Sequence, residues 1–385
     1  MVAGEPSGDL LGGRLMGELK RQSQGPLKFV GVGGERMIGE GLESLFDMRE
    51  LSVMGYLEVI PKILGLLARI RETAEAARRL RPDAVITIDS PEFTLRLAAR
   101  LKGLGAPLIH YVAPQVWAHR PGRAAKIAQY LDHVLALLPF EPPLFEAHGL
   151  PCTYVGHAIV EEGAEKGDGA DFRRRHAIPA EATVIAFLPG SRHGEVARHL
   201  PIFGAALGRL AAARPGLRAV VPTVAAVADE VARGTADWPL ESLVVTGAGE
   251  KYHAFSASQA ALAASGTVAL ELAIAGLPMV IAYRANPVTA WAMRRMLLVP
   301  YACLVNLILD RPVVPEFIQH RCRPDLLAEA VAGLLDDPEA RAAQIGEARR
   351  AVEILGLGGA SPSARAAEVV LGIIARKSEI KPEIA

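Results

Sequence analysis

Short apolar runs rich in branched side chains alternate along the chain with longer stretches whose apolar positions recur every three or four residues. The clearest strand-like runs cover residues 29–32, 84–88, 108–112, 133–137, 184–188, 219–222 and 243–245. Stretches with helical periodicity, such as 93–102 and 200–213, lie between them. This alternation predicts an α/β protein whose parallel sheets are covered by helices on both faces.

A polar segment interrupts the alternation near the middle of the chain. We interpret residues 161–182, which begin with a glycine-containing acidic stretch, as a linker between two domains. The domains then cover 1–160 and 183–358, and a final helical segment, 359–385, packs back on the first domain or on a partner subunit. We expect two Rossmann-like domains whose parallel sheets face a cleft between them, the usual place for a ligand.

The composition narrows the class of protein. The 385 residues are too many for one ordinary core, and 51% hydrophobic with 22% charged residues is typical of a folded globular protein. Lys+Arg and Asp+Glu both number 42, so no excess charge indicates a nucleic-acid partner. Cys152, Cys303 and Cys322 lack the spacing of a metal or redox site. No apolar run reaches the roughly 20 residues of a membrane span, and we expect a cytoplasmic protein.

The segment 260–283 carries the clearest chemical signal. Its apolar run ends at Ser265, Gly266 and Thr267, where a helical pattern begins. The N–H groups and the positive dipole end at a helix start favour a phosphate. Glu271, one turn after Thr267, would then accept hydrogen bonds from ribose hydroxyls. An ordinary helix N-cap followed by a solvated glutamate explains the same residues equally well.

A second glycine-containing turn follows the run 184–188. Gly190 permits close approach to the backbone, and the guanidinium of Arg192, next to Ser191, suits a diphosphate. A surface arginine beside a helix start is the alternative. Because this turn and the Ser265 turn belong to the same predicted domain, the pair favours a site for a nucleotide diphosphate.

Signatures of other nucleotide and metal sites are missing from the sequence. There is no Walker loop, and residues 31–34 resemble a dinucleotide fingerprint but have Arg36 in place of its third glycine. There is no Asp-x-Asp segment, and the histidines are not paired as metal ligands are. We therefore expect no nicotinamide or other cofactor and no catalytic metal.

The first domain carries a candidate general base. Asp89 ends a predicted strand, where it could accept a proton from a substrate hydroxyl, although its residue type alone favours a helix N-cap. His110 and Trp117 lie in a segment, 110–123, that gathers histidine, tryptophan and arginine beside another strand end. These side chains suggest a wall for a sugar or an anionic head group.

Two amphiphilic stretches, 51–81 and 291–301, combine apolar and basic residues in the manner of membrane-surface segments. For each alone, a core-facing helix with solvated arginines is the better interpretation. The first strand presents a different difficulty, because only three residues precede the turn-like segment 4–9, whereas a buried strand has about five. We expect either a curtailed strand or a natural start upstream of Met1.

In combination, these segments resemble the lipid-A-disaccharide synthase family nearly end to end. The motifs that carry the resemblance are residues 3–9, 51–55, 88–93, 110–117, 138–141, 155–157, 188–192, 264–267 and 314–317. The resemblance implies a GT-B fold and an inverting, metal-independent transfer. Diacylglucosamine would pass from UDP-2,3-diacylglucosamine to 2,3-diacylglucosamine 1-phosphate, giving a β-1,6-linked disaccharide 1-phosphate and UDP. The resemblance further implies peripheral contact with the cytoplasmic face of the inner membrane and no nucleic-acid partner, and it is compatible with a homodimer.

The resemblance also assigns site residues, motif by motif. Asp89 would deprotonate the 6-hydroxyl of the acceptor, and the acceptor side of the cleft would include Glu5, Ser7, Gly8, His110 and Trp117. The UDP donor would contact Gly190, Ser191, Arg192, Ser265, Gly266, Thr267, Glu271 and Asn306. The chain departs from the family at Val305, where a proline is usual, and at His119, where a second tryptophan is frequent.

Two other functions remain open from the sequence. UDP-N-acetylglucosamine 2-epimerases share the GT-B architecture and the donor cradle, but they use no acceptor and need no apolar surface. A nucleotide-sugar binding module without catalysis is the other alternative, and the retained Asp89 argues against it.

Overall fold

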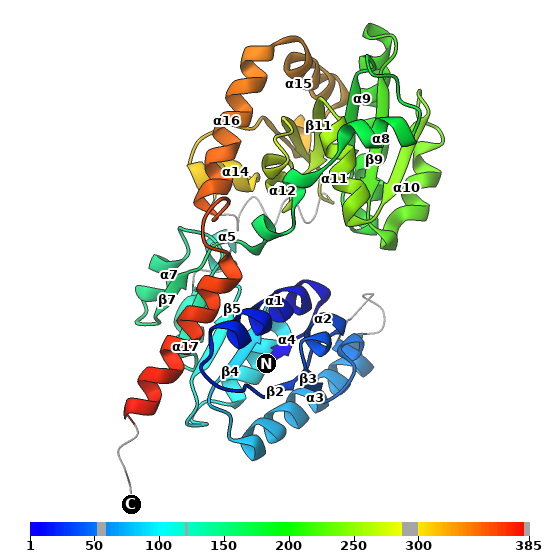
Figure 1. Ribbon diagram of the computed structural model, residues 1–385. Coiled ribbons are helices and arrows are strands. Elements are labelled where there is room, and N and C mark those ends of the chain that lie inside the picture. Colours follow the sequence, from blue (N-terminus) through cyan, green and yellow to red (C-terminus); the bar gives the residue numbers. More distant parts are fainter. Residues whose placement is uncertain (52–58, 120–121, 287–298, 381–385) are drawn as a thin grey trace, which may run out of the picture. The chain divides into compact units, whose positions relative to one another are not determined.

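The protein forms two compact α/β units, seen in a computed structural model that describes residues 1–51, 59–119, 122–286 and 299–380. The first unit comprises Met1–Ala158 and Gly359–Ala385, and the second comprises Ile159–Gly358 (Figure 1). Most of the amphiphilic stretch 291–301, and the beginning of the other, 51–81, lie outside the described residues. Of the helices that the structure describes, none is both long and apolar enough to cross a membrane.

The first unit is built on a five-stranded sheet in the order β1-β4-β5-β6-β7, in which all neighbours are parallel. Its strands are β1 (Val2–Ala3), β4 (Val85–Ile88), β5 (Leu108–Tyr111), β6 (His133–Ala136) and β7 (Cys152–Tyr154). A smaller parallel pair, β2 (Phe29–Gly31) and β3 (Leu42–Ser44), is joined to β1 through a bridge between Val2 and Val32. The first strand is therefore short, with two residues.

Helices cover both faces of this sheet, and its central strands are therefore buried. Every residue of β4 and β5 is buried, as a parallel strand between two helical layers requires. The helices are α1 (Pro6–Gln22), α2 (Glu35–Gly39), α3 (Val59–Leu80), α4 (Pro91–Arg100), α5 (Val116–His119), α6 (Gly122–Ile127), α7 (Pro142–Glu146) and α17 (Pro362–Ile380). The last of these packs against α1, where Gln22 Nε2 donates to the carbonyl of Ala364 over 3.0 Å (Figure 1).

The second unit contains a six-stranded parallel sheet in the order β10-β9-β8-β11-β12-β13. Its strands are β8 (Val184–Leu188), β9 (Arg218–Thr223), β10 (Ser242–Thr246), β11 (Ala260–Ala264), β12 (Met279–Tyr283) and β13 (Glu316–Ile318). Its helices are α8 (Gly169–Arg175), α9 (His193–Ala213), α10 (Ala228–Thr235), α11 (Ala248–Ala257), α12 (Val268–Ile274), α14 (Leu304–Leu309), α15 (Pro324–Asp336) and α16 (Pro338–Ile354). The parallel α/β architecture predicted from the pattern is confirmed.

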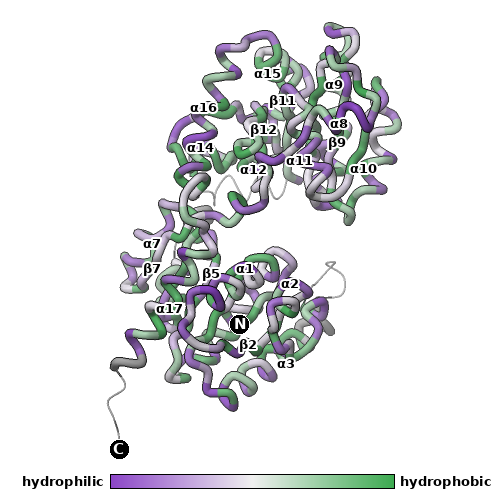
Figure 2. The backbone as a smooth tube through the Cα atoms, viewed as in Figure 1, coloured by the Kyte–Doolittle hydropathy of each residue, from purple (hydrophilic) through white to green (hydrophobic). Residues whose placement is uncertain are grey.

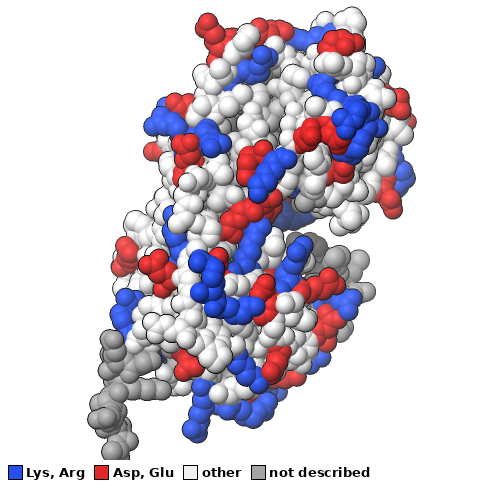
Figure 3. Space-filling model, viewed as in Figure 1, with Lys and Arg blue, Asp and Glu red and all other residues white. Residues whose placement is uncertain are grey.

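Hydropathy and charge are distributed as this architecture demands. The central strands β11 and β12 are mostly hydrophobic, whereas α8 is mostly hydrophilic (Figure 2). Along α9 the buried positions Val196, Leu200, Phe203 and Leu207 recur every three or four residues, so one stripe of the helix faces the sheet. On the face shown in Figure 3, acidic and basic side chains are interspersed, in keeping with the 42 residues of each sign.

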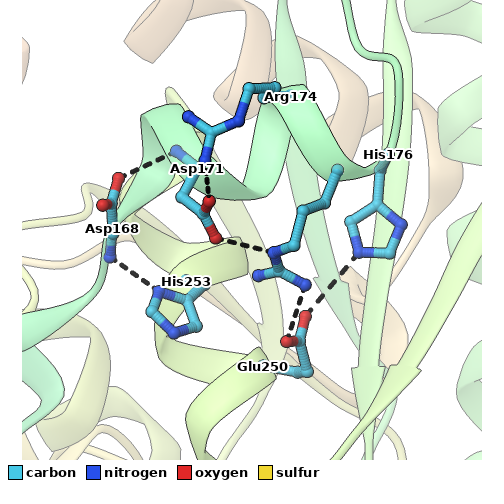
Figure 4. A network of polar contacts seen from close by, with 7 residues as sticks. Asp168, Asp171, Arg174, His176, Glu250 and His253 are labelled. Atoms are coloured by element: carbon cyan, nitrogen blue, oxygen red, sulfur yellow. Dashed lines mark hydrogen bonds and ion pairs between the residues drawn. The ribbon is translucent and has the colours of Figure 1, made fainter.

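The segment that the sequence presents as a linker is folded onto the second unit (Figure 4). Arg175 at the end of α8 bonds both Asp171 (Nε–Oδ2, 2.6 Å) and Glu250 on α11 (Nη1–Oε1, 2.8 Å). The amide of Asp168 donates to His253 Nδ1 over 2.8 Å. This polar network holds α8 against α11, so residues 161–182 are structured by the domain that follows them.

Candidate active site

Asp89 directly follows β4 and is held in an unusual backbone conformation. Its φ is 49° and that of Ser90 is 44°, so two consecutive residues other than glycine occupy the left-handed region. The Asp89 amide donates to the carbonyl of Tyr111 (3.0 Å), and the Thr94 hydroxyl donates to the Asp89 carbonyl (2.5 Å). Such strain persists only where the surroundings enforce it, and it is frequent at functional sites.

A hydroxyl from α1 orients the Asp89 carboxylate. Ser7 Oγ donates to Asp89 Oδ2 over 3.0 Å. Helix α1 can come this close because Gly8 has no side chain: a Cβ at Gly8 would lie 3.3 Å from the Ile88 carbonyl oxygen. Glu5 is exposed at the N-cap position of α1. The structure thus brings Ser7, Gly8 and Asp89 together at the carboxyl end of β4.

Asp9, which the sequence did not single out, has a structural part in the same motif. It is 5% exposed, and its carboxylate accepts hydrogen bonds from the amides of Gly34 (2.7 Å), Arg36 (3.0 Å) and Met37 (3.0 Å). The carboxylate therefore caps the start of α2. In the sequence, the Gly33-Gly34 pair before a helical pattern indicates this turn. Because glycine has no side chain, the start of α2 needs a cap from another part of the chain.

His110 lies inside the sheet and has no exposed surface. Its Nδ1 is 2.9 Å from Thr87 Oγ1 on the neighbouring strand, and burial lowers the pKa of His110 to about 3. The ring is therefore neutral and packed in the core. Its burial follows from the position of β5, which is buried on both faces, and the expected part of His110 in a substrate wall stays a prediction.

Trp117 is half-buried on α5 and is connected to a buried carboxylate. Its Nε1 donates to Glu141 Oε1 over 3.1 Å, and its ring meets Phe140 edge-on at 5.4 Å. Glu141 Oε2 accepts from the amides of Leu137 (3.1 Å) and Leu138 (2.9 Å). Burial raises the pKa of Glu141 to about 7, although these hydrogen bonds oppose the shift. The segment that follows β5 and the segment that follows β6 thereby form one cluster.

In the second unit, the turn after β8 is closed by a residue of α9. Gly190 has φ 122°, and a Cβ there would lie 2.7 Å from Glu195 Cβ. The Glu195 carboxylate accepts from the Ser191 amide (3.3 Å) and from Arg192 Nη1 (2.9 Å). The side chain of Arg192 is 80% exposed, so its guanidinium stands at the surface with the Glu195 carboxylate beside it. Sequence reasoning missed Glu195.

The Ser265 turn lies at the carboxyl end of β11, the strand next to β8. The Ser265 amide donates to the carbonyl of Ala282 (3.2 Å), and its hydroxyl donates to that of Ala302 (2.7 Å). Gly266 and Thr267 are exposed, and a Cβ on Gly266 would meet nothing within 4 Å. Since carboxyl ends of adjacent parallel strands share one edge, the two predicted turns are neighbours.

Glu271 is buried on α12. Its side chain is 10% exposed, and Oε1 accepts from Lys251 Nζ over 2.5 Å. The Tyr252 hydroxyl lies 3.2 Å from the same oxygen and 3.0 Å from Glu162 Oε2. Burial raises the pKa of Glu271, and the Lys251 ammonium opposes the shift. The solvated glutamate that the sequence also allowed is therefore wrong.

Asn306 is fully buried and positions a neighbouring loop. Its Oδ1 accepts from the Val314 amide (2.8 Å), and its Nδ2 donates to the Val314 carbonyl (2.8 Å) and to Glu316 Oε1 (2.7 Å). Glu316 in turn accepts from the amides of Ala302 and Cys303, each over 2.9 Å. The side-chain amide of Asn306 thus links the segment that follows the Ser265 turn to β13, and its expected contact with UDP stays a prediction.

The chain departs at Val305 and His119 from the usual sequence of the family that it resembles. Val305, where the family usually has proline, is buried in the first turn of α14, while the side chain of His119 lies outside the described ones.

Within the described parts of the chain, no group of three or more His, Cys, Asp or Glu side chains is arranged to hold a metal ion.

Solved structures similar to this chain share its fold. A UDP-GlcNAc 2-epimerase from Neisseria meningitidis bound to UDP-GlcNAc superposes with a TM-score of 0.62 at 13% identity, covering 97% of this chain and 98% of that one. CalG4, the calicheamicin glycosyltransferase, gives a TM-score of 0.58 at 17% identity, covering 99% and 97%. These neighbours confirm the predicted GT-B fold with two Rossmann-like domains.

Sequence comparison identifies the family. The model of the lipid-A-disaccharide synthetase family matches residues 1–368. The lipid-A-disaccharide synthase of Rhodospirillum centenum is 54% identical over 379 residues, which cover 98% of this chain and 94% of that protein. That of Paramagnetospirillum magneticum is 51% identical over 383 residues, covering 98% of each. With motifs matching along its whole length, the chain belongs to the lipid-A-disaccharide synthase family.

Proposed function

We propose that this protein is a lipid-A-disaccharide synthase that condenses UDP-2,3-diacylglucosamine with 2,3-diacylglucosamine 1-phosphate and releases UDP. The observation that carries the proposal is the family match, which extends over residues 1–368. The GT-B fold supports a glycosyltransferase, since this fold holds a nucleotide sugar at the carboxyl ends of parallel strands.

Asp89 is the proposed general base. Its carboxylate takes the proton from the acceptor 6-hydroxyl as that oxygen bonds to C1 of the donor sugar, while the bond from C1 to UDP breaks. Attack on the face opposite the leaving group inverts C1. The 3.0 Å bond from Ser7 supports this role, because it fixes one carboxylate oxygen and leaves the other to receive the proton.

UDP departs with the electron pair of the broken bond, so its diphosphate gains negative charge. We place this diphosphate between the Arg192 guanidinium and the turn of Ser265, Gly266 and Thr267. The 80% exposure of Arg192 and the adjacency of β8 and β11 support this placement. A charge-assisted hydrogen bond from arginine stabilises such an anion more strongly than a neutral donor does.

The first unit then holds the acceptor and the catalytic base, and the second holds the donor. Contact with the cytoplasmic face of the inner membrane forms part of the proposal. It is supported by α3, where Leu64 is 68% exposed and Arg71 and Arg79 are exposed as well. The homodimer rests on the family resemblance alone, and a mass measured by light scattering tests it.

The decisive experiment mixes both substrates with the protein and follows the disaccharide 1-phosphate by mass spectrometry. We expect one UDP for each disaccharide formed. UDP release that needs no acceptor would point instead to a hydrolase or an epimerase.

The Asp89→Asn variant tests the base. We expect kcat to fall by about 10²–10⁴-fold with intact UDP binding, as for the loss of one general base. Asp83→Asn is the matched control, since Asp83 is an exposed carboxylate just before the amino end of the same strand, β4. Normal turnover by Asp89→Asn would refute the assignment.

A further inference from the structure

His199 on α9 connects two loops of the second unit that are far apart in sequence. Its ring is completely buried, with Nδ1 at 2.7 Å from the Pro189 carbonyl oxygen and Nε2 at 3.0 Å from the Arg284 amide nitrogen. A carbonyl only accepts a hydrogen bond and an amide N–H only donates one. The ring must therefore carry its proton on Nδ1 and offer the lone pair of Nε2, which defines a neutral ring in a single tautomer.

The surroundings favour that state of the ring. Burial lowers the pKa of His199, although the Pro189 carbonyl opposes this shift. Phe203 stacks on the ring with centroids 5.7 Å apart, and Tyr283 lies at 5.5 Å. A buried side chain packed against two aromatic rings has little freedom, so its two hydrogen bonds hold their partners at a defined separation.

The two partners flank the Ser265 turn. Pro189 follows β8, Arg284 follows β12, and β11 lies between these strands in the sheet. Strands that are two positions apart are separated by roughly 10 Å, and the ring with its hydrogen bonds bridges this gap. His199 thus spans the carboxyl end of the strand from which Ser265 and Thr267 emerge.

Helix α9 holds the β8 loop at a second point. Glu195, one turn before His199 on the same face, accepts from the Ser191 amide and from Arg192. Glu195 therefore orients the outer part of the loop, while His199 anchors its base at Pro189 and couples that base to the neighbouring loop at Arg284.

We propose that His199 is a positioning residue of the donor site, which sets the spacing of the loops on either side of the Ser265 turn and thereby the affinity for the UDP moiety. This inference rests on the proposed function, in which Arg192 of the β8 loop and the Ser265 turn hold the diphosphate. The side chain itself touches no substrate.

Three variants separate the two hydrogen bonds. The amide in His199→Asn keeps a donor near Pro189, the longer amide in His199→Gln reaches toward Arg284 with an acceptor, and His199→Leu retains neither bond. We expect His199→Leu to raise both the Kd for UDP, measured by calorimetry, and the KM for the UDP-sugar about tenfold. The Asn and Gln variants fall between this and the wild type, and the KM for the acceptor is unchanged in all three.

Gln344→Leu is the matched control for loss of a buried polar bridge. Gln344 is 6% exposed and bonds both the amide (2.7 Å) and the carbonyl (3.1 Å) of Met279, at the amino end of β12. We expect its thermal midpoint to fall as in His199→Leu, while its Kd for UDP stays at the wild-type value.

The outcomes distinguish this inference from the proposed function. A wild-type protein that does not bind UDP contradicts both. If the wild type binds UDP and the His199 variants that fold bind it equally well, the inference alone is overturned. It is also overturned if Gln344→Leu weakens UDP binding by the same factor, because the effect would then follow from lost stability.

Discussion

Asp89 and Glu141 are carboxylates at the carboxyl edge of one sheet, and their surroundings give them different chemistry. Asp89 is half-buried and accepts one hydroxyl, as suits a group that must meet a substrate. Glu141 is 2% exposed and accepts three N–H donors, including the indole of Trp117. The loss of hydration on burial destabilises the charged form of Glu141 more than these hydrogen bonds stabilise it. The pKa of Glu141 therefore rises to about 7.

The raised pKa of Glu141 makes stability depend on pH with a definite sign. Below about 4.5 the carboxyl is protonated in both the folded and the unfolded chain, and between there and about 7 only the folded chain keeps the proton. The free energy of unfolding therefore decreases as pH rises through this window, by on the order of 3 kcal/mol from this group. The glutamine in Glu141→Gln has no titratable carboxyl group. When its carbonyl oxygen replaces Glu141 Oε2, its NH2 group faces the Trp117 N–H, and two hydrogen-bond donors oppose each other.

We expect Glu141→Gln to be less stable than the wild type at pH 5 and to approach it by pH 8, with thermal midpoints measured by circular dichroism. Glu146→Gln serves as control, because Glu146 is an exposed carboxylate on the adjacent helix α7. A stability difference between Glu141→Gln and the wild type that does not change with pH would show that Glu141 is ionised throughout.

Residue types and spacing predicted the two turns of the proposed donor site but not the side chains beneath them. Gly190 and the Ser265 turn stand at strand ends, where a local pattern is sufficient. Glu195 and His199 act on backbone groups of loops, and nothing in the order of residues shows which carbonyl or amide a folded helix will face. The burial of His110 and Asn306 was not predicted either, since it follows from tertiary packing.

At the scale of elements, the position of α1 against β4 decides the geometry of the proposed base. Gly8→Ala places a Cβ 3.3 Å from both Ala3 Cβ and the Ile88 carbonyl oxygen, so the helix must move by a few tenths of an ångström. Alanine favours a helix over glycine by about 1 kcal/mol, which offsets part of this contact in stability. The shift still separates Ser7 from Asp89.

We expect Gly8→Ala to lower kcat about tenfold while its thermal midpoint stays close to that of the wild type. Gly17→Ala provides the comparison within α1, because a Cβ at Gly17 meets its nearest atoms, those of Glu40, at an ordinary 3.8 Å. That variant should gain stability and keep full activity. Equal kcat in both variants would mean that the approach of α1 does not govern the base.

The pattern predicted the central strands well but missed three short strands at sheet edges. The seven runs identified from hydrophobicity are all strands, with ends that differ by one residue at most. The three-residue strands β3, β7 and β13 were missed, and each lies at the end of its sheet. An edge strand needs only one paired side and one short ladder, so its composition is mixed and its identity depends on its neighbour.

At the scale of the whole molecule, the chain leaves the first unit after Ala158 and returns to it at Gly359. The amphipathic pattern of the last helix was compatible with either the first domain or a partner subunit. In the structure α17 packs on α1, which completes the first unit with residues from both ends of the chain. The proposed assignment of the acceptor to the first unit and of the donor to the second can therefore be tested within the intact protein.

Hydrogen exchange in the presence of UDP provides this test. A ligand at 100 times its Kd stabilises the bound state by about 2.7 kcal/mol, and only amides whose exposure requires release of the ligand gain protection. We expect saturating UDP to slow exchange in residues 188–200 and 262–275 and to leave the first unit unchanged, as measured by mass spectrometry of peptides. In Arg192→Ala the same protection should need a higher UDP concentration, because the exposed guanidinium no longer meets the diphosphate. Protection concentrated around Ser7 and Asp89 would instead assign the nucleotide to the first unit.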